Sequence, residues 1–169
     1  MLSLTCVRAA QTEIDAQTQV NIAAAATWLG SDQGLQILTS VCRNRTIPVY
    51  ARIHAARYAF DKQDHSCLPS LIQLMRPAAE PDERIMAMSV ASQMKSKTPQ
   101  EAQVVLESAL LALRDKNARV KLHACEALRL INDPRSLQPL RKAIDDEREE
   151  SVMQQMKSSL DYLERNHHN

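Results

Sequence analysis

The sequence predicts an all-α protein, and three observations support this fold class. Only two glycines occur among 169 residues, and aromatic residues make up 3% of the chain. A β-rich fold needs more turn glycines and more β-branched and aromatic residues than this. Apolar residues instead recur at helical spacing along most of the chain, and the helical runs themselves repeat. We therefore expect helices throughout, joined by short turns.

One helical run recurs at intervals that suit a repeated structural unit. Val120 is followed on the same helix face by four apolar residues: Ala124, Ala127, Leu128 and Ile131. Comparable runs predict five such helices, which begin near residues 20, 51, 83, 120 and 152. Their starts are separated by 31, 32, 37 and 32 residues. A period in this range is typical of stacked helical hairpins.

Each repeat also contains a first helix that precedes the next recurring run. These first helices are predicted over residues 34–42, 67–75, 101–113 and 135–144. A flanking helix is expected over residues 1–15, and residues 164–169 are expected to form a frayed tail. Ser, Asp, Asn and Pro gather at the breaks, where they cap helix starts or fit the first helical turn. The breaks therefore separate hairpins that share a core only when they stack.

Residues 115–140 carry the clearest copy of the repeated pattern, DKNARVKLHACEALRLINDPRSLQPL. The segment places an Asp before a Val with a basic neighbour, then Ala and Ala-Leu, then an Asp-Pro turn and a Leu-rich helix. This pattern resembles HEAT-like repeats, in particular the short bacterial form related to the bilin-lyase HEAT-like repeat. The segment 49–75 matches well, whereas the segments 20–45, 83–113 and 145–163 match more weakly. The resemblance covers about 140 residues.

The resemblance implies a single repeat domain over residues 1–169. Its fold would be a right-handed α-α superhelix, or α-solenoid, of about five stacked hairpins. Two repeats depart from the family pattern. The third has Glu83 where Val is expected, and the last has Met153 and Gln154 where a basic residue is expected.

Charge, hydropathy and cysteine spacing argue against several classes of protein. Lys and Arg total 21 against 20 for Asp and Glu, so no strong net field attracts nucleic acid. No apolar run reaches the roughly 18 residues of a membrane helix, so we expect no membrane span. Four cysteines lack paired spacing, which suggests reduced thiols and a cytoplasmic location: Cys6, Cys42, Cys67 and Cys125.

The sequence shows no constellation typical of an enzyme. It contains no H-E-x-x-H motif, no glycine-rich phosphate loop and no His-Glu pairs of the kind found in iron-binding HEAT-repeat hydroxylases. His123 and Glu126 lie three residues apart on one helix but have no evident further ligands. Cys42 lies near Arg43 and Arg45, with no base nearby in sequence. We therefore expect a protein without catalytic residues, metal or cofactor.

A basic row is predicted on the side of the recurring helices that faces away from the core. Counted from position zero of each recurring helix, positions one, five, six and nine lie opposite core positions zero, four and seven. The candidate partner-binding residues on this side are Arg52, Arg57, Arg84, Lys121 and Arg129. Arg52, Arg84 and Lys121 also suit a structural ladder, in which each bonds an Asp of a neighbouring turn. The sequence leaves the ladder, a partner-binding strip and simple solvation open.

An apolar row occupies position two of the same helices, at Ile22, Ile53, Ile85 and Leu122. Packing between neighbouring repeats explains this row better than a docking groove. Gln154 replaces the apolar residue in the last repeat, as expected for an exposed cap.

These observations predict a non-catalytic protein-interaction scaffold or adaptor, which binds a partner through the concave face of the solenoid. The partner could be an acidic segment, because the candidate residues are basic. Two alternatives come from the resemblance: binding of nucleic-acid backbone, as in HEAT-like DNA glycosylases, or a role as a lyase or lyase subunit. The sequence does not indicate the identity of the partner, the biological process or the oligomeric state.

Overall fold

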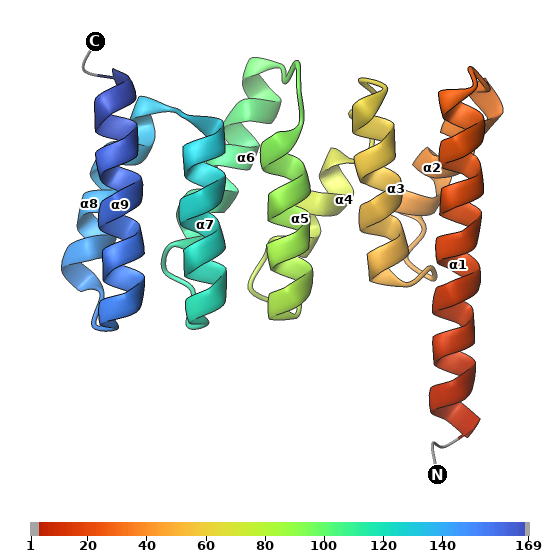
Figure 1. Ribbon diagram of the computed structural model, residues 1–169, viewed down its shortest axis with the longest axis horizontal. Helices are drawn as coiled ribbons and strands as arrows, with labels where there is room; N and C mark the ends of the chain where they lie inside the picture. The colour runs from red at the N-terminus through yellow and green to blue at the C-terminus, as the bar shows by residue number, and fades with distance from the viewer. Residues whose placement is uncertain (1–3, 168–169) are drawn as a thin grey trace. The chain divides into compact units, whose positions relative to one another are not determined.

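The computed structural model describes the backbone of residues 4–167 and the side chains of residues 12–167, and it is helical throughout (Figure 1). The described residues form nine α-helices and one 3-10 helix, and no strand occurs among them. This confirms the predicted all-α class, an α-solenoid of stacked helical hairpins. Internal contacts divide the chain into two compact units, unit 1 over residues 1–71 and unit 2 over residues 72–169. The single domain expected over residues 1–169 stays a prediction.

Unit 1 contains three complete helices that pack against one another: α1 (Leu4–Trp28), α2 (Asp32–Arg43) and α3 (Val49–Asp61). In Figure 1, α1 and α3 run side by side, and α2 packs against both of them from behind. A fourth helix, α4 (Leu68–Leu74), begins in unit 1 and ends in unit 2.

Unit 2 contains the remaining elements: α5 (Pro81–Gln93), α6 (Pro99–Ala112), α7 (Ala118–Ile131), η1 (Pro134–Ser136), α8 (Leu137–Asp146) and α9 (Glu150–His167). Helices α5, α7 and α9 form one row in which α7 packs against both neighbours (Figure 1). Helix α6 packs behind α5 and α7, and α8 packs behind α9. The row exposes one side to solvent and buries the other.

The recurring helices α3, α5, α7 and α9 each begin two residues before the expected start. The first recurring helix differs more, because α1 runs without a break from Leu4 to Trp28 and includes the flanking helix expected over residues 1–15. No Pro or Gly lies between residues 15 and 20 to interrupt it. At the other end of the chain, α9 continues to His167, so a frayed tail is not seen in residues 164–167. Residues 168–169 lie outside the described part.

Polar caps begin several of the helices. The Ser31 side chain accepts a hydrogen bond from Gly34 N–H, and Asn117 caps α7 by accepting from two backbone N–H groups. Thr98 and Glu101 form a reciprocal capping box at the start of α6. Such caps satisfy N–H groups that the helix itself leaves unpaired. The predicted breaks therefore act as helix starts.

Alanine allows the recurring helices to pack closely. Ala55 and Ala59 in α3 and Ala87 and Ala91 in α5 are fully buried. Gly34 allows a similarly close approach of α1 and α2, since an added Cβ would lie 2.6 Å from the Thr27 hydroxyl oxygen. Larger residues such as Leu128 fill the remaining core of unit 2. The helices can therefore pack this closely only because small residues lie where they meet.

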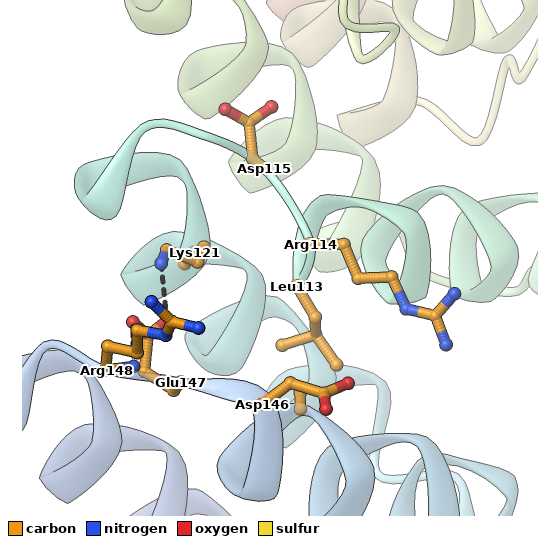
Figure 2. A pocket seen from close by; sticks show the side chains of 8 residues that line it. Leu113, Arg114, Asp115, Lys121, Asp146, Glu147 and Arg148 are labelled. Carbon is orange, nitrogen blue, oxygen red and sulfur yellow. Dashed lines mark hydrogen bonds and ion pairs between the residues drawn. The ribbon is translucent and has the colours of Figure 1, made fainter.

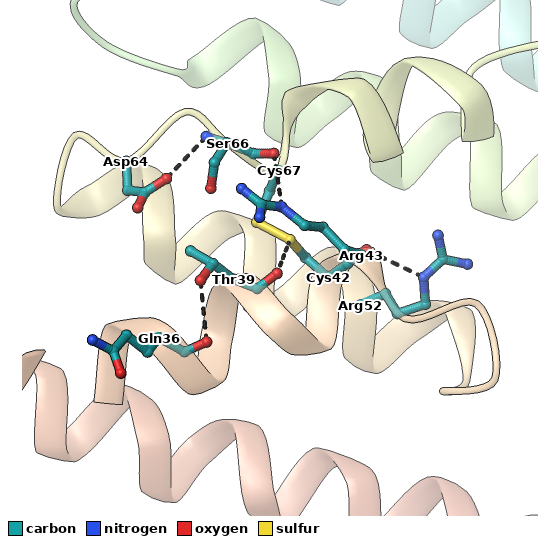
Figure 3. The surroundings of a disulfide bond; sticks show 8 residues. All are labelled: Gln36, Thr39, Cys42, Arg43, Arg52, Asp64, Ser66 and Cys67. Carbon is teal, nitrogen blue, oxygen red and sulfur yellow. Dashed lines mark hydrogen bonds between the residues drawn. A yellow bond between two sulfur atoms is a disulfide. The ribbon is translucent and has the colours of Figure 1, made fainter. Parts of the chain in front are cut away.

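A disulfide bond joins Cys42 and Cys67, so the expectation of reduced thiols is wrong for these two residues (Figure 3). Cys42 lies at the end of α2 and Cys67 just before α4, with their Cα atoms 5.9 Å apart. The α2–α3 and α3–α4 turns bring them together, which sequence spacing could not show. Cys125 is free and buried, as expected, whereas the side chain of Cys6 lies outside the described part.

The disulfide is expected to stabilise unit 1 selectively. It closes a loop of 25 residues around α3, and a loop of this size restricts the unfolded chain by roughly 3–4 kcal/mol. We expect protein trapped with an alkylating agent in its native host to carry the Cys42–Cys67 bond. We also expect the double variant Cys42→Ala/Cys67→Ala to shift the denaturant midpoint of Trp28 fluorescence, which reports unit 1. A variant with an unchanged Trp28 transition would contradict this prediction.

The core of unit 2 gives a second stability prediction. Leu128 is fully buried in α7, whereas Leu130, two residues later, is 52% exposed. Truncation of a buried leucine removes packing and leaves a cavity, so Leu128→Ala should lower the free energy of unfolding by about 2–5 kcal/mol. Leu130→Ala is the matched control and should change it little. Urea denaturation followed by circular dichroism measures both, and equal effects would show that the core face of α7 is wrongly assigned.

Candidate partner-binding surface

Arg84 does not face a partner, because α5 buries it in a polar contact between turns. Its guanidinium donates to the Asp115 carboxylate at 3.2 Å and to the Pro77 carbonyl at 3.0 Å. The side chains of Arg84 and Asp115 are 3% and 6% exposed. Loss of one member of such a buried pair typically costs about 3–5 kcal/mol, since the other charge is left unpaired. The contact links the start of α5 to the α6–α7 turn.

Lys121 makes the corresponding contact one repeat later. Its ammonium group bonds to the carboxylate of Glu147, which lies in the turn between α8 and α9. The two side chains are 15% and 8% exposed. Backbone N–H groups of Arg148 and Glu149 also donate to Glu147, at 2.9 and 3.0 Å. These bonds, led by the one from Lys121, hold the pKa of Glu147 below its ordinary value.

A cleft of about 430 Å³ opens beside this ion pair. Figure 2 shows Lys121 directed at Glu147 beside Arg148, while Arg114 points away from them. The residues that line the cleft are Leu113, Arg114, Asp115, Lys121, Ala143, Asp146, Glu147 and Arg148. Acidic and basic side chains are equal in number here, and the most buried of them already bond to one another or to Arg84. The cleft is therefore a gap between bonded turns with no excess charge.

Arg52 occupies the same position in α3 and is 7% exposed. Its Nε donates to the carbonyl of Cys42 at 3.3 Å (Figure 3), so it bonds the end of the preceding helix. Arg43 extends this set of contacts by donating to the Ser66 carbonyl at 3.4 Å. Both bonds brace the segment that the disulfide closes.

The structure thus assigns three of the five candidate residues to structural contacts. Arg84 bonds an Asp of a neighbouring turn, as the ladder requires, whereas Lys121 bonds Glu147 and Arg52 bonds the Cys42 carbonyl; we call these three contacts the ladder. Partner binding by the candidate residues stays a prediction. The helix-wheel prediction went wrong because each recurring helix is covered on its sides as well as behind. The side chain one residue after position zero, such as Arg84, therefore points at a neighbouring turn. The side chain five residues after it, such as Cys125 in α7, is buried. Arg57 is exposed, and Arg129 and Lys121 are partly buried, but only Lys121 of these two is held in an ion pair among the described residues.

The solvent-exposed side of α7 carries a different set of residues, which we call the α7 face. It consists of His123, Glu126, Arg129 and Leu130 from α7 and Tyr162 from α9. The guanidinium carbon of Arg129 lies 4.6 Å from the centre of the Tyr162 ring, a cation–π contact between the two helices. Leu130 is 52% exposed. An apolar side chain and a stacked arginine therefore lie next to each other in the α7 sequence.

Sequence reasoning missed Leu130 and Tyr162 as candidates. Leu130 lies off the helix face marked by Val120 and Leu128, so periodicity could have indicated its exposure. Tyr162 could not be found in this way, because its contact with Arg129 depends on how α9 packs against α7.

The apolar row at position two of the recurring helices is only partly buried. Ile53 and Ile85 are buried, whereas Ile22 is 65% exposed.

His123 and Glu126 form an ion pair on the α7 face, with His123 Nδ1 3.2 Å from the Glu126 carboxylate. With Ser89 and Ser92 of α5 they border a shallow hollow between the two helices. Glu126 is 64% exposed, and the hollow has almost no free volume. This arrangement does not offer a space in which a serine, a histidine and a substrate could meet. It is a surface ion pair.

Two observations in the described part of the chain concern metal ligands and the free thiol. Within that part, no group of three or more His, Cys, Asp or Glu side chains is placed to hold a metal ion. Burial raises the pKa of the Cys125 thiol to about 12, so this thiol stays protonated at neutral pH. Among the described residues, no helix is both long enough and apolar enough to cross a membrane.

The lowered pKa of Glu147 gives a pH-dependent stability prediction. A carboxylate with a lowered folded-state pKa contributes stability above its unfolded pKa and loses it as the pH falls through the folded value. Glu147→Gln should therefore lower the free energy of unfolding at pH 7. The difference in this free energy between the variant and the wild type should shrink below about pH 4.3, the ordinary glutamate pKa. Urea denaturation at pH 7 and pH 3 measures this difference. Asp146→Asn is the control, since Asp146 is exposed in the same cleft. An undiminished difference at pH 3 would contradict the prediction.

Comparison with known proteins supports the repeat architecture. A family model described as HEAT repeats matches residues 68–161, which is more than half of the chain. No curated protein matches the chain, and no solved structure does. The matched segment begins at α4 and ends within α9, so it includes the Arg84 and Lys121 contacts and the α7 face. The chain belongs to the HEAT-repeat family.

Proposed function

We propose that the chain is a non-catalytic interaction module that binds a segment of a partner protein across the α7 face. HEAT repeats are commonly protein-interaction scaffolds. The observation that carries the proposal is the adjacency of exposed Leu130 to Arg129, which stacks on Tyr162. Tyrosine and arginine are enriched among the residues that dominate binding energy at protein interfaces. Exposed Leu130, which borders the hollow on the α5 side of α7, adds apolar area at low entropic cost.

The geometry of Arg129 supports an acidic partner segment. The Tyr162 ring covers one face of the guanidinium, and Arg129 makes no ion pair among the described residues. Stacking leaves the N–H edge of a guanidinium able to donate two parallel bonds to a carboxylate. The partner segment would thus place a carboxylate at Arg129 and an apolar side chain at Leu130.

Arg57 has a separate place in the proposal because it lies in unit 1. Its side chain is exposed on α3, so it could contribute to partner binding there. Arg52, Arg84 and Lys121 are withdrawn from the candidate strip by their internal contacts. The nucleic-acid alternative loses its main support for the same reason, since it required a repeated row of exposed basic residues.

The cysteines favour an oxidising compartment as the place of action. The expected cytoplasmic location rested on reduced thiols, and the Cys42–Cys67 disulfide removes that basis. Stable disulfides are rare in the reducing cytosol and common in oxidising compartments. Alkylation of the protein in its native host tests this location as well as the bond, and free Cys42 and Cys67 thiols would restore the cytoplasmic expectation.

The α7 face can be tested by comparing what variants capture from host lysate. The double variant Arg129→Glu/Leu130→Asp changes the proposed contacts but leaves the core of α7 intact. We expect it to lose, by at least about tenfold, a protein that the wild type retains, which corresponds to about 1.4 kcal/mol. Lys157→Glu on the exposed side of α9 is the control and should retain that protein.

Two further measurements make this comparison decisive. Binding of the captured protein should weaken as salt is raised, because an exposed charge pair is screened. The melting temperature of Arg129→Glu/Leu130→Asp should fall only slightly, since an exposed cation–π contact is worth about 0.5–1 kcal/mol. Equal capture by the wild type and this variant would exclude the α7 face as the binding surface.

A further inference from the structure

Helix α1 and Leu29, the first residue after it, expose an apolar stripe on the side that faces away from α2 and α3. Three large residues in this stripe are solvent exposed, Ile14 to 58%, Ile22 to 65% and Leu29 to 89%. Thr18 and Ala25 are exposed between them at helical spacing. The Thr18 hydroxyl donates to the Ile14 carbonyl at 2.8 Å, so its polar group is satisfied within the helix. The stripe residues themselves carry no charge, and the exposed Asp15 and Asn21 border them; the Asn21 side-chain oxygen accepts a hydrogen bond from Gln17 at 3.0 Å.

A contiguous exposed apolar stripe on a helix is unusual for a free surface. Contiguous apolar patches of roughly 300–600 Å² are the largest on a typical monomer and are often functional. In stacked helical repeats, the outer side of a helix that lacks a further neighbour is normally polar. α1 departs from this rule. Its exposed apolar residues indicate that another helix covers them.

Helix α9 shows the contrast, because its exposed side is polar throughout. Its exposed residues there are Gln154, Lys157, Ser158, Asp161 and Arg165. If α9 of one copy packed on α1 of another, Lys157 and Asp161 would be buried against isoleucine without partners, which is costly. Head-to-tail association of copies through these two helices is therefore disfavoured. The surface that best suits the α1 stripe is a second α1 stripe.

We propose that α1 is a homodimer interface, in which the stripes of two copies pack against each other in antiparallel orientation about a twofold axis. The spacing of the stripe suits this arrangement. If Ile14 of one copy meets Leu29 of the other, then Thr18 meets Ala25 and Ile22 meets Asn21, so large residues pair at the ends and small residues pair between them. Ile22 then lies next to the axis, close to Asn21 and Ile22 of the other copy. An isologous contact needs this kind of self-complementarity.

The interface should give a weak dimer. Each stripe has only three large apolar residues, so we expect a contact toward the lower end of specific interfaces, which is about 1,200 Å² in total. Sedimentation equilibrium over about 10–500 μM should show a mass that rises from 19.0 kDa toward twice that value, as expected for a micromolar dissociation constant. The Cys6→Ser background prevents dimers that could arise from oxidation of that thiol.

The decisive variant is Ile22→Lys, which places two like charges near the twofold axis. It should raise the dissociation constant at least about tenfold without a change in melting temperature, since Ile22 is largely exposed. Gln19→Lys adds the same charge to the same helix at an exposed position outside the stripe, and it should leave the dimer intact. A mass of 19.0 kDa at every concentration, or equal weakening by both substitutions, would overturn the proposal.

A cross-linking experiment tests the orientation independently. Ile22→Cys should form a covalent dimer under mild oxidation, because antiparallel packing places this position beside its own copy. Gln19→Cys should form little. A dimer that persists in sedimentation but is cross-linked equally by both cysteines would show that the copies meet elsewhere, and would also overturn the proposal.

Discussion

The fold depends on the burial of the alanine-rich sides of its recurring helices. A helix such as α3 or α7 cannot cover these residues within its own hairpin, because the paired first helix packs only behind it. Ala55 and Ala59 in α3, and Ala124 in α7, are fully buried. Alanine offers little area for packing unless helices approach closely, and close approach is possible only because the side chain is small. Stacking is thus the condition under which each helix is stable at all.

The ladder of polar contacts is a consequence of this stacking. Turns at one edge of the row bring backbone carbonyls and carboxylates near the first residues of the recurring helices. Arg84 and Lys121 reach these groups in unit 2, and Arg52 reaches the end of α2 in unit 1. Long side chains at this position satisfy groups that would otherwise be buried unpaired. The ladder stabilises the folded protein only where all its members are bonded. Its main effect is therefore to fix how neighbouring turns meet.

The sequence was sufficient to predict most of the helices and their order, because those features depend on local signals; the exception is α1, which joins two helices that were expected to be separate. Asn132, Asp133 and Pro134 mark a turn, and Thr98 with Pro99 marks a helix start, through backbone chemistry that acts within a few residues. The core face of α7 followed from the spacing of Val120 and Leu128. These signals do not depend on how one helix packs on another.

The contacts around the candidate site were less predictable, because they depend on packing between elements. Cys42 and Cys67 carry no local sign that they pair, and only the α3 turns bring them together. Whether an arginine on a recurring helix is buried or exposed depends on the neighbouring turn, which a helix wheel does not contain. Arg129 and Tyr162 likewise meet only because of the register between α7 and α9.

The proposed function implies that partner recognition depends on the division between the ladder and the exposed surface. A row of evenly spaced basic residues would bind extended acidic chains with little selectivity, since charge alone decides. Here the repeated basic position is used inside the fold, and the exposed residues differ from one helix to the next. The α7 face offers one leucine and one arginine stacked on a tyrosine, held on helices that the Lys121–Glu147 contact ties together. Recognition at such a surface depends on shape and on a few side chains, so a regular repeat can present an irregular and selective site.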